Sequence, residues 1–491
     1  MDSLTRLRQV IRKKIGSKKF VVASHSEPYL HYYSEGQIRW RKAAGGLVTA
    51  LDPVMQVCKG TWVAYGGGDA DADVSSPSGR VRVPPDDAKY VLQRVALSKD
   101  ELVGYLDGAS HSALWPWCHF AYVRPVFDDA QWGVYREVNR RFADAVIRSV
   151  GKKPAFVWLN DYHLALAAKD IKQRRPDIVT AQFWHVPWPH VELFKICPWG
   201  REILEAMLYN DLVGFQIRNY ANNFLDSVDQ TLQARVDREQ SSIYYKQSKT
   251  AVRRFPISID YRAVRKAARS VSDAQLSAVR RHLGLVAPHL VVSVDRLDYA
   301  KGLSEKMATL DAFFEQHPKW RGRLTLVQVA SPTRSQVPAY RYNTEHVRAQ
   351  ADAVNYRWGE GDWKPVVLLN AFVPYSDVVA LYRMADACWI HSLHDGMNLV
   401  AKEYVASKVD GNGVLLLSQF TGAAREMPES VFTNPYAVND SVKALKAALE
   451  LPLPERRKRM EKLAREVQDH DVYAWAADFI NDIARLESTV V

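Results

Sequence analysis

The chain has 491 residues, of which 47% are hydrophobic and 25% are charged. This composition is typical of a folded protein with two or three domains and excludes a disordered one. Lysine and arginine (66) outnumber aspartate and glutamate (55) and leave a formal net charge of +11. The excess favours an anionic partner, such as nucleic acid, a membrane surface or a phosphorylated ligand, without choosing among them.

The sequence carries no recognisable targeting signal. Its basic N-terminal residues lack the apolar core of a signal peptide, and no run of 18 apolar residues predicts a transmembrane helix. Four scattered cysteines lack both a CxxC pair and metal-binding spacing: Cys58, Cys118, Cys197 and Cys388. They are typical of reduced thiols, so we expect a cytoplasmic protein without a metal site.

In chain order, short apolar runs alternate with helical stretches through the first half of the sequence. Such runs predict buried parallel strands, and they cover residues 20–23, 62–65, 155–159, 179–184 and 211–215. The polar stretch 69–87, with its Ser-Ser-Pro-Ser-Gly and Pro-Pro segments, predicts a loop or a small insertion.

The same alternation returns in the second half, at residues 290–294, 324–329, 365–369, 388–390 and 414–417. We therefore predict an α/β fold of two Rossmann-like, doubly wound domains that face a central cleft, with a boundary near residues 255–258. The predicted domains are 1–255 and 256–470, followed by an amphipathic C-terminal helix in 471–491.

Ligands of open α/β sheets bind beyond the carboxyl ends of the strands, so the residues that follow each strand are the candidates for a site. Gly45 and Gly46 precede a predicted helix, where backbone N–H groups can approach a diphosphate, although a tight turn explains such a pair more often. Asp161 follows the 155–159 strand and is either a sugar-binding or basic carboxylate or, as local sequence favours, a helix N-cap. His185 lies in a rigid, aromatic strand exit, where it is placed to bind a sugar hydroxyl or to fill the core.

Two segments of the second half favour a nucleotide-sugar site. Arg296 and Lys301 follow the 290–294 strand, five residues apart across a turn, and can direct two cations at one diphosphate. The alternative is a surface ion-pair network with neighbouring aspartates. After the 388–390 strand, Asp395 begins a glycine-containing turn into a helix, and Glu403 on that helix is placed to bind two ribose hydroxyls.

Over nearly its whole length the sequence resembles the trehalose-phosphate synthase family of retaining glycosyltransferases with the GT-B fold. The segments that carry the resemblance are Ala-Gly-Gly-Leu at 44–47, Ala-Leu-Trp-Pro at 113–116, Asn-Asp-Tyr-His at 160–163, His-Val-Pro at 185–187, residues 294–302 and residues 395–405. Glucosylglycerol-phosphate synthases share a Glu-Pro-Tyr like that at 27–29.

The resemblance implies a UDP-glucose donor, no metal, and a set of functional residues. The implied catalytic residues are Asp161, His185, Arg296, Lys301 and Asp395. The implied donor-binding residues are Gly45, Gly46, Arg296, Lys301, Asp395, Gly396, Met397, Asn398, Leu399, Val400 and Glu403. It further implies an acceptor-binding first domain, a donor-binding second domain, and a C-terminal helix that crosses back to the first.

The departures from the family lie at the acceptor end. Acceptor-binding residues are expected at Ser26, Tyr65, Tyr105, Trp115, Asp161 and Arg334. Members that use glucose 6-phosphate have Ser-Asn-Arg where this chain has Ser24-His25-Ser26. They have a tyrosine at the position of Leu106, which is next to Tyr105 in this chain. They also have an arginine where this chain has His394. Losing one charged phosphate contact typically costs about 1.5–3 kcal/mol. Glucose 6-phosphate is the default acceptor, and a different or unphosphorylated one stays open.

Three functions therefore compete. The favoured one is an α-retaining glucosyltransferase that acts on UDP-glucose and glucose 6-phosphate or a related acceptor, with no nucleic-acid or membrane partner; a homo-oligomer stays open. The second is a glucosylglycerol-phosphate synthase or a pseudoglycosyltransferase with an altered acceptor. The third is a basic protein that binds nucleic acid or acidic lipid, which the modest charge excess favours least.

Overall fold

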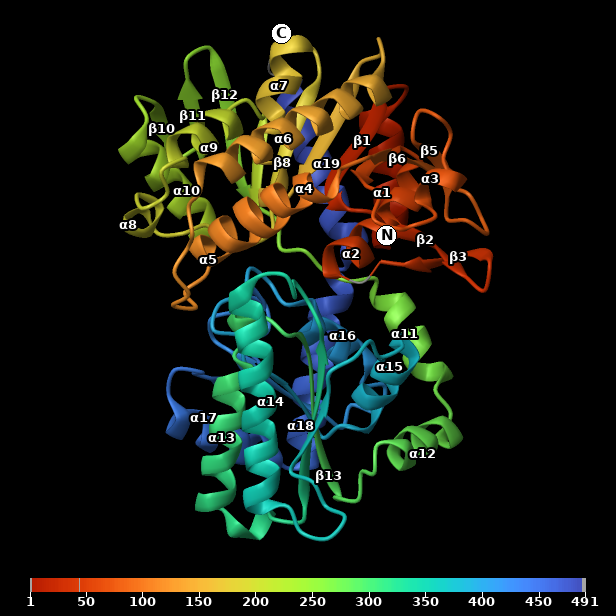
Figure 1. Cartoon of the computed structure of the whole chain (residues 1–491), viewed down its shortest axis with the longest axis vertical. Coiled ribbons are helices and arrows are strands. Elements are labelled where there is room, and N and C mark those ends of the chain that lie inside the picture. The colour runs from red at the N-terminus through yellow and green to blue at the C-terminus, as the bar shows by residue number, and fades with distance from the viewer. Residues whose placement is uncertain (1, 44, 488–491) are drawn as a thin grey trace. The chain divides into compact units, whose positions relative to one another are not determined.

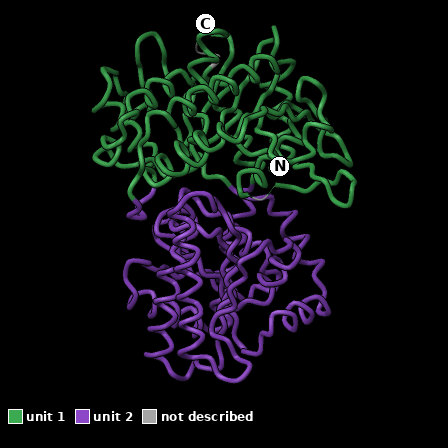
Figure 2. The backbone as a smooth tube through the Cα atoms, viewed as in Figure 1, with its two compact units in different colours: residues 1–118, 124–257, 472–491 green, residues 119–123, 258–471 purple. Residues whose placement is uncertain are grey.

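The computed structural model describes residues 2–43 and 45–487, and the chain divides into two compact units (Figure 2). Unit 1 comprises residues 1–118, 124–257 and 472–491, and unit 2 comprises residues 119–123 and 258–471. A short excursion of the chain, 119–123, thus belongs to unit 2 although its neighbours on both sides belong to unit 1.

Unit 1 is built on a ten-stranded sheet whose inner strands are parallel. These run in the order β12-β9-β8-β7-β1-β4-β6, with bounds β1 (Lys19–Ser26), β4 (Thr61–Tyr65), β6 (Tyr90–Val95), β7 (Ala155–Asn160), β8 (Val179–Trp184), β9 (Leu212–Phe215) and β12 (Ser248–Arg254). Antiparallel strands flank them: β5 (Arg80–Val83) on one side, and β10 (Arg235–Asp237) and β11 (Ser242–Tyr245) on the other. The strand order reverses at β1, so the gap between β1 and β7 is the topological switch point of unit 1.

The helices of unit 1 cover this sheet (Figure 1). They are α1 (Ser3–Val10), η1 (Ile11–Ile15), α2 (Gly46–Cys58), α3 (Asp71–Val74), α4 (Lys99–Leu102), η2 (Val103–Leu114), α5 (Trp115–Cys118), α6 (Asp129–Val150), η3 (Tyr162–Leu164), α7 (Ala167–Arg174), α8 (Val191–Phe194), α9 (Gly200–Met207), α10 (Arg218–Thr231) and α19 (Val472–Glu487). The C-terminal α19 packs on α1, with an ion pair between Arg6 and Asp478. It also stacks Phe479 on Trp158 of β7, at 4.3 Å between ring centroids.

Unit 2 has a six-stranded, all-parallel sheet in the order β15-β14-β13-β16-β17-β18. Its strands are β13 (His289–Arg296), β14 (Leu324–Ser331), β15 (Val366–Leu369), β16 (Ala387–Ile390), β17 (Val414–Ser418) and β18 (Val431–Thr433). Counted along the chain this is the 3-2-1-4-5-6 order of a Rossmann fold, with its switch point between β13 and β16.

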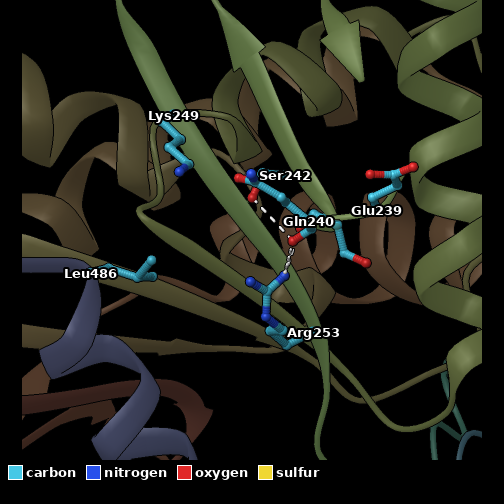
Figure 3. Close-up of a pocket in the computed structure, with 7 residues that line it drawn as sticks. Glu239, Gln240, Ser242, Lys249, Arg253 and Leu486 are labelled. Atoms are coloured by element: carbon cyan, nitrogen blue, oxygen red, sulfur yellow. Dashed lines mark hydrogen bonds between the residues drawn. The ribbon is translucent and has the colours of Figure 1, made fainter. Parts of the chain in front are cut away.

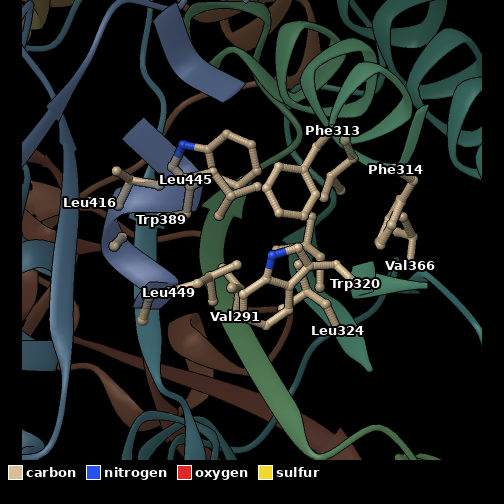
Figure 4. Packing of buried hydrophobic residues seen from close by; sticks show 14 of the residues in the cluster. Val291, Phe313, Phe314, Trp320, Leu324, Val366, Trp389, Leu416, Leu445 and Leu449 are labelled. Carbon is tan, nitrogen blue, oxygen red and sulfur yellow. The ribbon is translucent and has the colours of Figure 1, made fainter. Parts of the chain in front are cut away.

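Helices pack on both faces of the unit 2 sheet (Figure 1). They are α11 (Tyr261–Ser270), α12 (Asp273–His282), η4 (Tyr299–Lys301), α13 (Leu303–Gln316), η5 (Pro318–Trp320), α14 (Pro338–Trp358), α15 (Tyr375–Met384), α16 (Leu399–Ser407), η6 (Gly422–Arg425), α17 (Val438–Glu450) and α18 (Leu453–Asp469). Figure 4 shows the core on one face, where Phe313 and Phe314 of α13 and Leu445 of α17 pack against Val291 and Trp389 of the sheet. This core fixes the strand ends that carry the candidate site.

The ten strands predicted from apolar runs are all present, and the predicted α/β class with two Rossmann-like units is confirmed. The prediction of a loop for 69–87 is wrong in part, because this stretch contains α3 and the edge strand β5. A hairpin of β2 (Tyr29–Ser34) and β3 (Gln37–Lys42) was also not predicted; β3 is exposed throughout, and β2 is partly buried. None of the described helices is long and apolar enough to cross a membrane.

Candidate functional site

The loop after β13 places two cations at the switch point of unit 2. Asp298 accepts a hydrogen bond from the backbone N–H of Ala300 at 3.0 Å and so begins the η4 turn. Gly302, with φ +65°, lies so close to the carbonyl of His391 that no side chain fits there. Arg296 lies 3.9 Å from Asp298 and its side chain is 44% exposed, which leaves the guanidinium accessible to a ligand.

Lys301 forms a short ion pair with Asp395, 2.6 Å from Nζ to Oδ2, across the switch point. Asn398 Nδ2 (3.1 Å) and Ser392 Oγ (3.3 Å) donate to the same oxygen. Burial raises the pKa of Asp395, but the charge and hydrogen bond of Lys301 outweigh this effect. The resulting pKa is about 2, below the ordinary value. Asp395 is therefore a fixed anion, and the cluster joins the two loops that flank the switch point.

The turn from Asp395 into α16 contains a strained residue that also caps the helix. Asn398 has φ +137°, rare for a residue with a side chain, and accepts a hydrogen bond from the N–H of Ala401 at 3.0 Å as the helix cap. The predicted donor-binding residues Gly396, Met397, Leu399 and Val400 lie in this turn and the first turn of α16. A helix N-terminus with backbone N–H groups is a favourable place for an anion.

Glu403 lies one turn further along α16, partly buried. Tyr382 donates a hydrogen bond to it at 3.4 Å. Burial raises the pKa of Glu403 to about 7, against a small opposing effect of the tyrosine hydrogen bond. A carboxylate with two acceptor oxygens in this position can bind two vicinal hydroxyls.

Sequence reasoning missed a buried ion pair beneath this site. Lys306 of α13 is fully buried and donates to Ser293 Oγ at 2.5 Å, Gln328 Oε1 at 2.8 Å and Asp295 Oδ2 at 3.3 Å. Asp295 is the residue before Arg296, so the pair fixes the end of β13. The surface ion-pair alternative for Asp295 is thus wrong, because Asp295 pairs with the buried Lys306.

His394, one of the departures from the family pattern, is buried and binds the excursion 119–123. Its ring stacks on Phe120 at 4.5 Å, and its Nδ1 accepts the N–H of Phe120 at 3.3 Å. Tyr436 Oη donates to the carbonyl of Phe120 at 2.6 Å. Burial, aided by nearby His119, lowers the pKa of His394 to about 3, so this histidine is a neutral structural group beside Asp395.

Arg334, a predicted acceptor-binding residue, is bound within unit 2. Its side chain is buried, lies 3.5 Å from Asp298 Oδ2 and donates to Tyr340 Oη. It has φ +49°. The buried carboxylate of Asp298 thus lies between two arginines, Arg334 and Arg296.

Asp161 and His185 lie together at the switch point of unit 1. Asp161 has φ +68° and ψ 171°, a region almost confined to glycine, and its side chain does not cap η3. Asp161 holds the N-cap position of η3, as that alternative predicted, but its Oδ1 accepts the N–H of His185 at 3.2 Å. The ring of His185 bonds to Asn160 at 3.1 Å and Gln216 at 3.3 Å, and burial lowers its pKa to about 3.

The predicted acceptor residues of unit 1 are partly brought together. Tyr65 and Tyr105 both lie against His25, at 5.6 and 5.5 Å between ring centroids. Ser26 is exposed at the end of β1. Trp115 is buried, and its ring centroid lies 6.0 Å from that of Tyr162, the residue that follows Asp161. Gly45, with φ +139°, is the N-cap of α2, which begins at Gly46; Ala44 lies outside the described residues.

A surface pocket of unit 1 lies away from the predicted site residues. A pocket of about 470 Å³ is lined by residues of the β11–β12 edge, among them Lys249 and Arg253 (Figure 3). Arg253 donates to the carbonyls of Gln240 and Ser241 there, at 2.9 and 2.7 Å, and no predicted site residue lines the pocket. Within residues 2–43 and 45–487, no group of three or more His, Cys, Asp or Glu side chains is placed to hold a metal ion.

Comparison with known proteins agrees with this geometry. The model of glycosyltransferase family 20 matches residues 17–485. Trehalose-6-phosphate synthase of Mycolicibacterium smegmatis is 35% identical, over 96% of this chain and 94% of its own. A solved structure described as trehalose-6-phosphate from E. coli, bound with UDP-2-fluoro glucose, has a TM-score of 0.85 and 28% identity and covers 95% of this chain and 99% of its own.

The same values of TM-score and coverage, with 26% identity, hold for the UDP-forming α,α-trehalose-phosphate synthase of Burkholderia xenovorans in complex with glucose-6-phosphate. These matches confirm the predicted GT-B class, and the chain belongs to glycosyltransferase family 20.

Proposed function

We propose that this chain is a retaining hexosyltransferase that transfers glucose from UDP-glucose to a hydroxyl of glucose 6-phosphate or a related sugar acceptor, as in trehalose-phosphate synthesis. The observation that carries the proposal is the cluster of Lys301, Asp395 and Asn398 at the switch point of unit 2. The names of the similar proteins, and the donor analogue and glucose-6-phosphate bound in their structures, support the choice of substrates.

In the donor site, Arg296 and Lys301 of unit 2 would bind the diphosphate. Glu403 would accept hydrogen bonds from the ribose hydroxyls, and Asp395 with the amides of the α16 turn would bind the glucose. Lys301 and Asp395 are held before the donor arrives, because Lys301 and Asn398 both donate hydrogen bonds to Asp395. Such preorganised groups stabilise developing charge without rearrangement.

In the reaction, the bond between glucose C1 and the UDP phosphate oxygen breaks while a bond from C1 to the acceptor oxygen forms on the same face. The acceptor hydroxyl proton passes to the departing phosphate oxygen, so no enzymic nucleophile is needed. Arg296 and Lys301 offset the negative charge that develops on the diphosphate. Asp161 and His185 would orient the sugars, and the neutral ring of His185 offers a hydrogen bond rather than a charge.

The test is UDP release from UDP-glucose with a panel of acceptors: glucose 6-phosphate, glycerol 3-phosphate, free glucose and buffer alone. We expect release that depends on a sugar acceptor, and Glu403→Ala should abolish UDP-glucose binding. Normal binding by that variant would contradict the site. We further propose that the enzyme acts in the cytoplasm. We also propose that it needs no metal, so added EDTA should leave the turnover of the purified enzyme unchanged.

A further inference from the structure

The segment 119–123, which belongs to unit 2, is bound to the loop that carries Asp395. Three groups of Phe120 take part. Its ring stacks on that of His394, with 4.5 Å between centroids and 16° between planes. Its N–H donates to His394 Nδ1 at 3.3 Å, and its carbonyl accepts a hydrogen bond from Tyr436 Oη at 2.6 Å. The ring and both backbone groups of one residue are thus engaged, which fixes the position of the segment.

Tyr436, which follows β18, joins this segment to residues 393–395. Its Oη also lies 3.2 Å from the carbonyl of Leu393, so one hydroxyl serves both stretches of chain. Its ring meets Phe420 edge-on at 5.3 Å, and the carbonyl of Phe420 accepts the N–H of Asp395 at 3.1 Å. Burial raises the pKa of Tyr436, so the hydroxyl keeps its proton and remains a donor at neutral pH.

The loop 393–395 is also bonded to η4, the turn that follows β13. The N–H of Leu393 donates to the carbonyl of Ala300 in η4 at 2.8 Å, and the carbonyl of Asp395 accepts the N–H of Gly422 at 3.1 Å. Because the backbone of Asp395 is bonded at both its N–H and its carbonyl, the direction of its side chain depends on where the loop is held.

His119, at the start of the segment, lies near the Asp395 carboxylate. Its ring centroid is 6.0 Å from that of His394. Burial raises the pKa of Asp395 and Lys301 lowers it most, and the charge of His119 adds a smaller lowering effect, which requires proximity. The segment therefore faces the carboxylate in addition to binding the residue before it.

His394 can hold Phe120 because an imidazole has an acceptor nitrogen. Burial lowers the pKa of His394 to about 3, so the ring is neutral at pH 7 and one of its nitrogens accepts. Arginine, which family members that use glucose 6-phosphate have here, has only donors and could not receive the Phe120 N–H. The attachment of Phe120 is therefore a property of the histidine in this chain.

We infer that Phe120, His394 and Tyr436 are positioning residues for sugar transfer: they fix the loop 393–395 and thereby the direction of the Asp395 carboxylate. The inference rests on the proposed function, in which Asp395 binds the transferred glucose. The UDP part of the donor is assigned to other residues, so loss of the attachment should weaken the contact with glucose and leave UDP binding nearly intact.

The first experiment uses Tyr436→Phe, which removes the hydroxyl and keeps the ring. Its control is Tyr356→Phe, at a tyrosine of α14 that is 94% exposed. We expect kcat for glucose transfer to fall about tenfold or more in Tyr436→Phe, with the Kd of UDP within about twofold of the wild type and the control unchanged. An unchanged kcat, or a UDP affinity that falls as much as kcat, would overturn the inference.

Two variants of His394 test the hydrogen bond to Phe120. His394→Leu removes the acceptor, whereas His394→Asn keeps an acceptor oxygen near the place of Nδ1. We expect His394→Leu to lose kcat about tenfold or more and His394→Asn to recover about threefold of that loss. Hydrogen–deuterium exchange of the Phe120 amide should be about tenfold faster in His394→Leu and intermediate in His394→Asn. Equal kcat losses in both variants, or an exchange rate that neither changes, would refute the role of His394.

Binding measurements keep the inference testable apart from turnover. By calorimetry, the affinity for UDP-glucose should fall about fivefold or more in Tyr436→Phe and His394→Leu, while that for UDP stays within about twofold. If the wild type transfers glucose to no acceptor, the proposed function fails, and these affinities still decide the inference. Equal losses for UDP and UDP-glucose would show a general disturbance of unit 2 and overturn it, and so would unchanged affinities for both.

Discussion

Lys301 and Asp395 lie 94 residues apart in the sequence and 2.6 Å apart in the structure. They follow β13 and β16, the two strands on either side of the switch point in unit 2, so their pairing is a direct consequence of the 3-2-1-4-5-6 strand order. The pair gives the proposed donor site a lysine whose position is fixed by Asp395, and an aspartate that stays ionised.

Removing Lys301 and removing Arg296 should have different effects on the free energy of unfolding. Lys301→Met leaves Asp395 buried without its main partner and should lower the free energy of unfolding by about 2–4 kcal/mol. Arg296→Met removes a more exposed side chain and should change it by at most about 0.5 kcal/mol. Both should lower kcat by about 100-fold or more. Urea unfolding and steady-state kinetics measure the two effects; equal destabilisation by both variants would refute the assigned geometry.

Glu403 should make donor binding depend on pH. Its pKa of about 7 means that it is protonated below neutrality, when it offers fewer acceptor sites to the ribose. The affinity for UDP-glucose should therefore rise about tenfold between pH 6 and pH 8, as measured by calorimetry. Glu403→Gln should bind more weakly with a flat profile, and a pH-dependent profile in that variant would assign the titration to another group.

The same residue should oppose stability at high pH. Its folded pKa, about 7, lies above its ordinary value of 4.5, so between these values the unfolded chain releases a proton that the folded chain retains. Stability from this group therefore falls as pH rises through the window. Relative to the wild type, Glu403→Gln should be more stable at pH 8 than at pH 4 by about 1–3 kcal/mol. A difference that does not change with pH, in thermal unfolding, would contradict this.

The backbone conformation of Asp161 should cost stability, while its side chain should be needed for activity. Its φ and ψ are nearly exclusive to glycine, so Asp161→Gly should relieve about 1–2 kcal/mol of strain and offset the lost hydrogen bond to His185. We expect an equal or higher melting temperature together with a loss of transfer activity of at least 100-fold. Asp161→Asn keeps the side-chain shape and serves as the control, with lower activity and no gain in stability.

The buried Lys306–Asp295 pair should matter chiefly for folding. Lys306→Met leaves the Asp295 carboxylate uncompensated and should lower the free energy of unfolding by about 3–5 kcal/mol. The double variant Lys306→Met/Asp295→Asn should recover most of that loss. Denaturant unfolding checks both, and a double variant no more stable than the single one would mean that Lys306 acts through packing alone.

The sequence predicted the strands well because buried parallel strands are continuous apolar runs, as at residues 414–417. It also placed Arg296, Lys301 and Asp395 at strand ends. It did not predict the β2–β3 hairpin, because β3 is exposed and β2 is only partly buried, so neither strand is a continuous apolar run. Nor did it predict the stacking of His25 between Tyr65 and His163, because contacts between distant segments depend on strand order, which no local pattern encodes.

The most direct measurement is an NMR assay of UDP-glucose with glucose 6-phosphate and with free glucose, followed to completion. The account predicts UDP together with a non-reducing disaccharide, or its phosphate, whose transferred glucose keeps the α configuration. A β-configured product would contradict the retaining mechanism. UDP-glucose that binds tightly but is transferred to no acceptor would contradict the proposed enzyme activity itself.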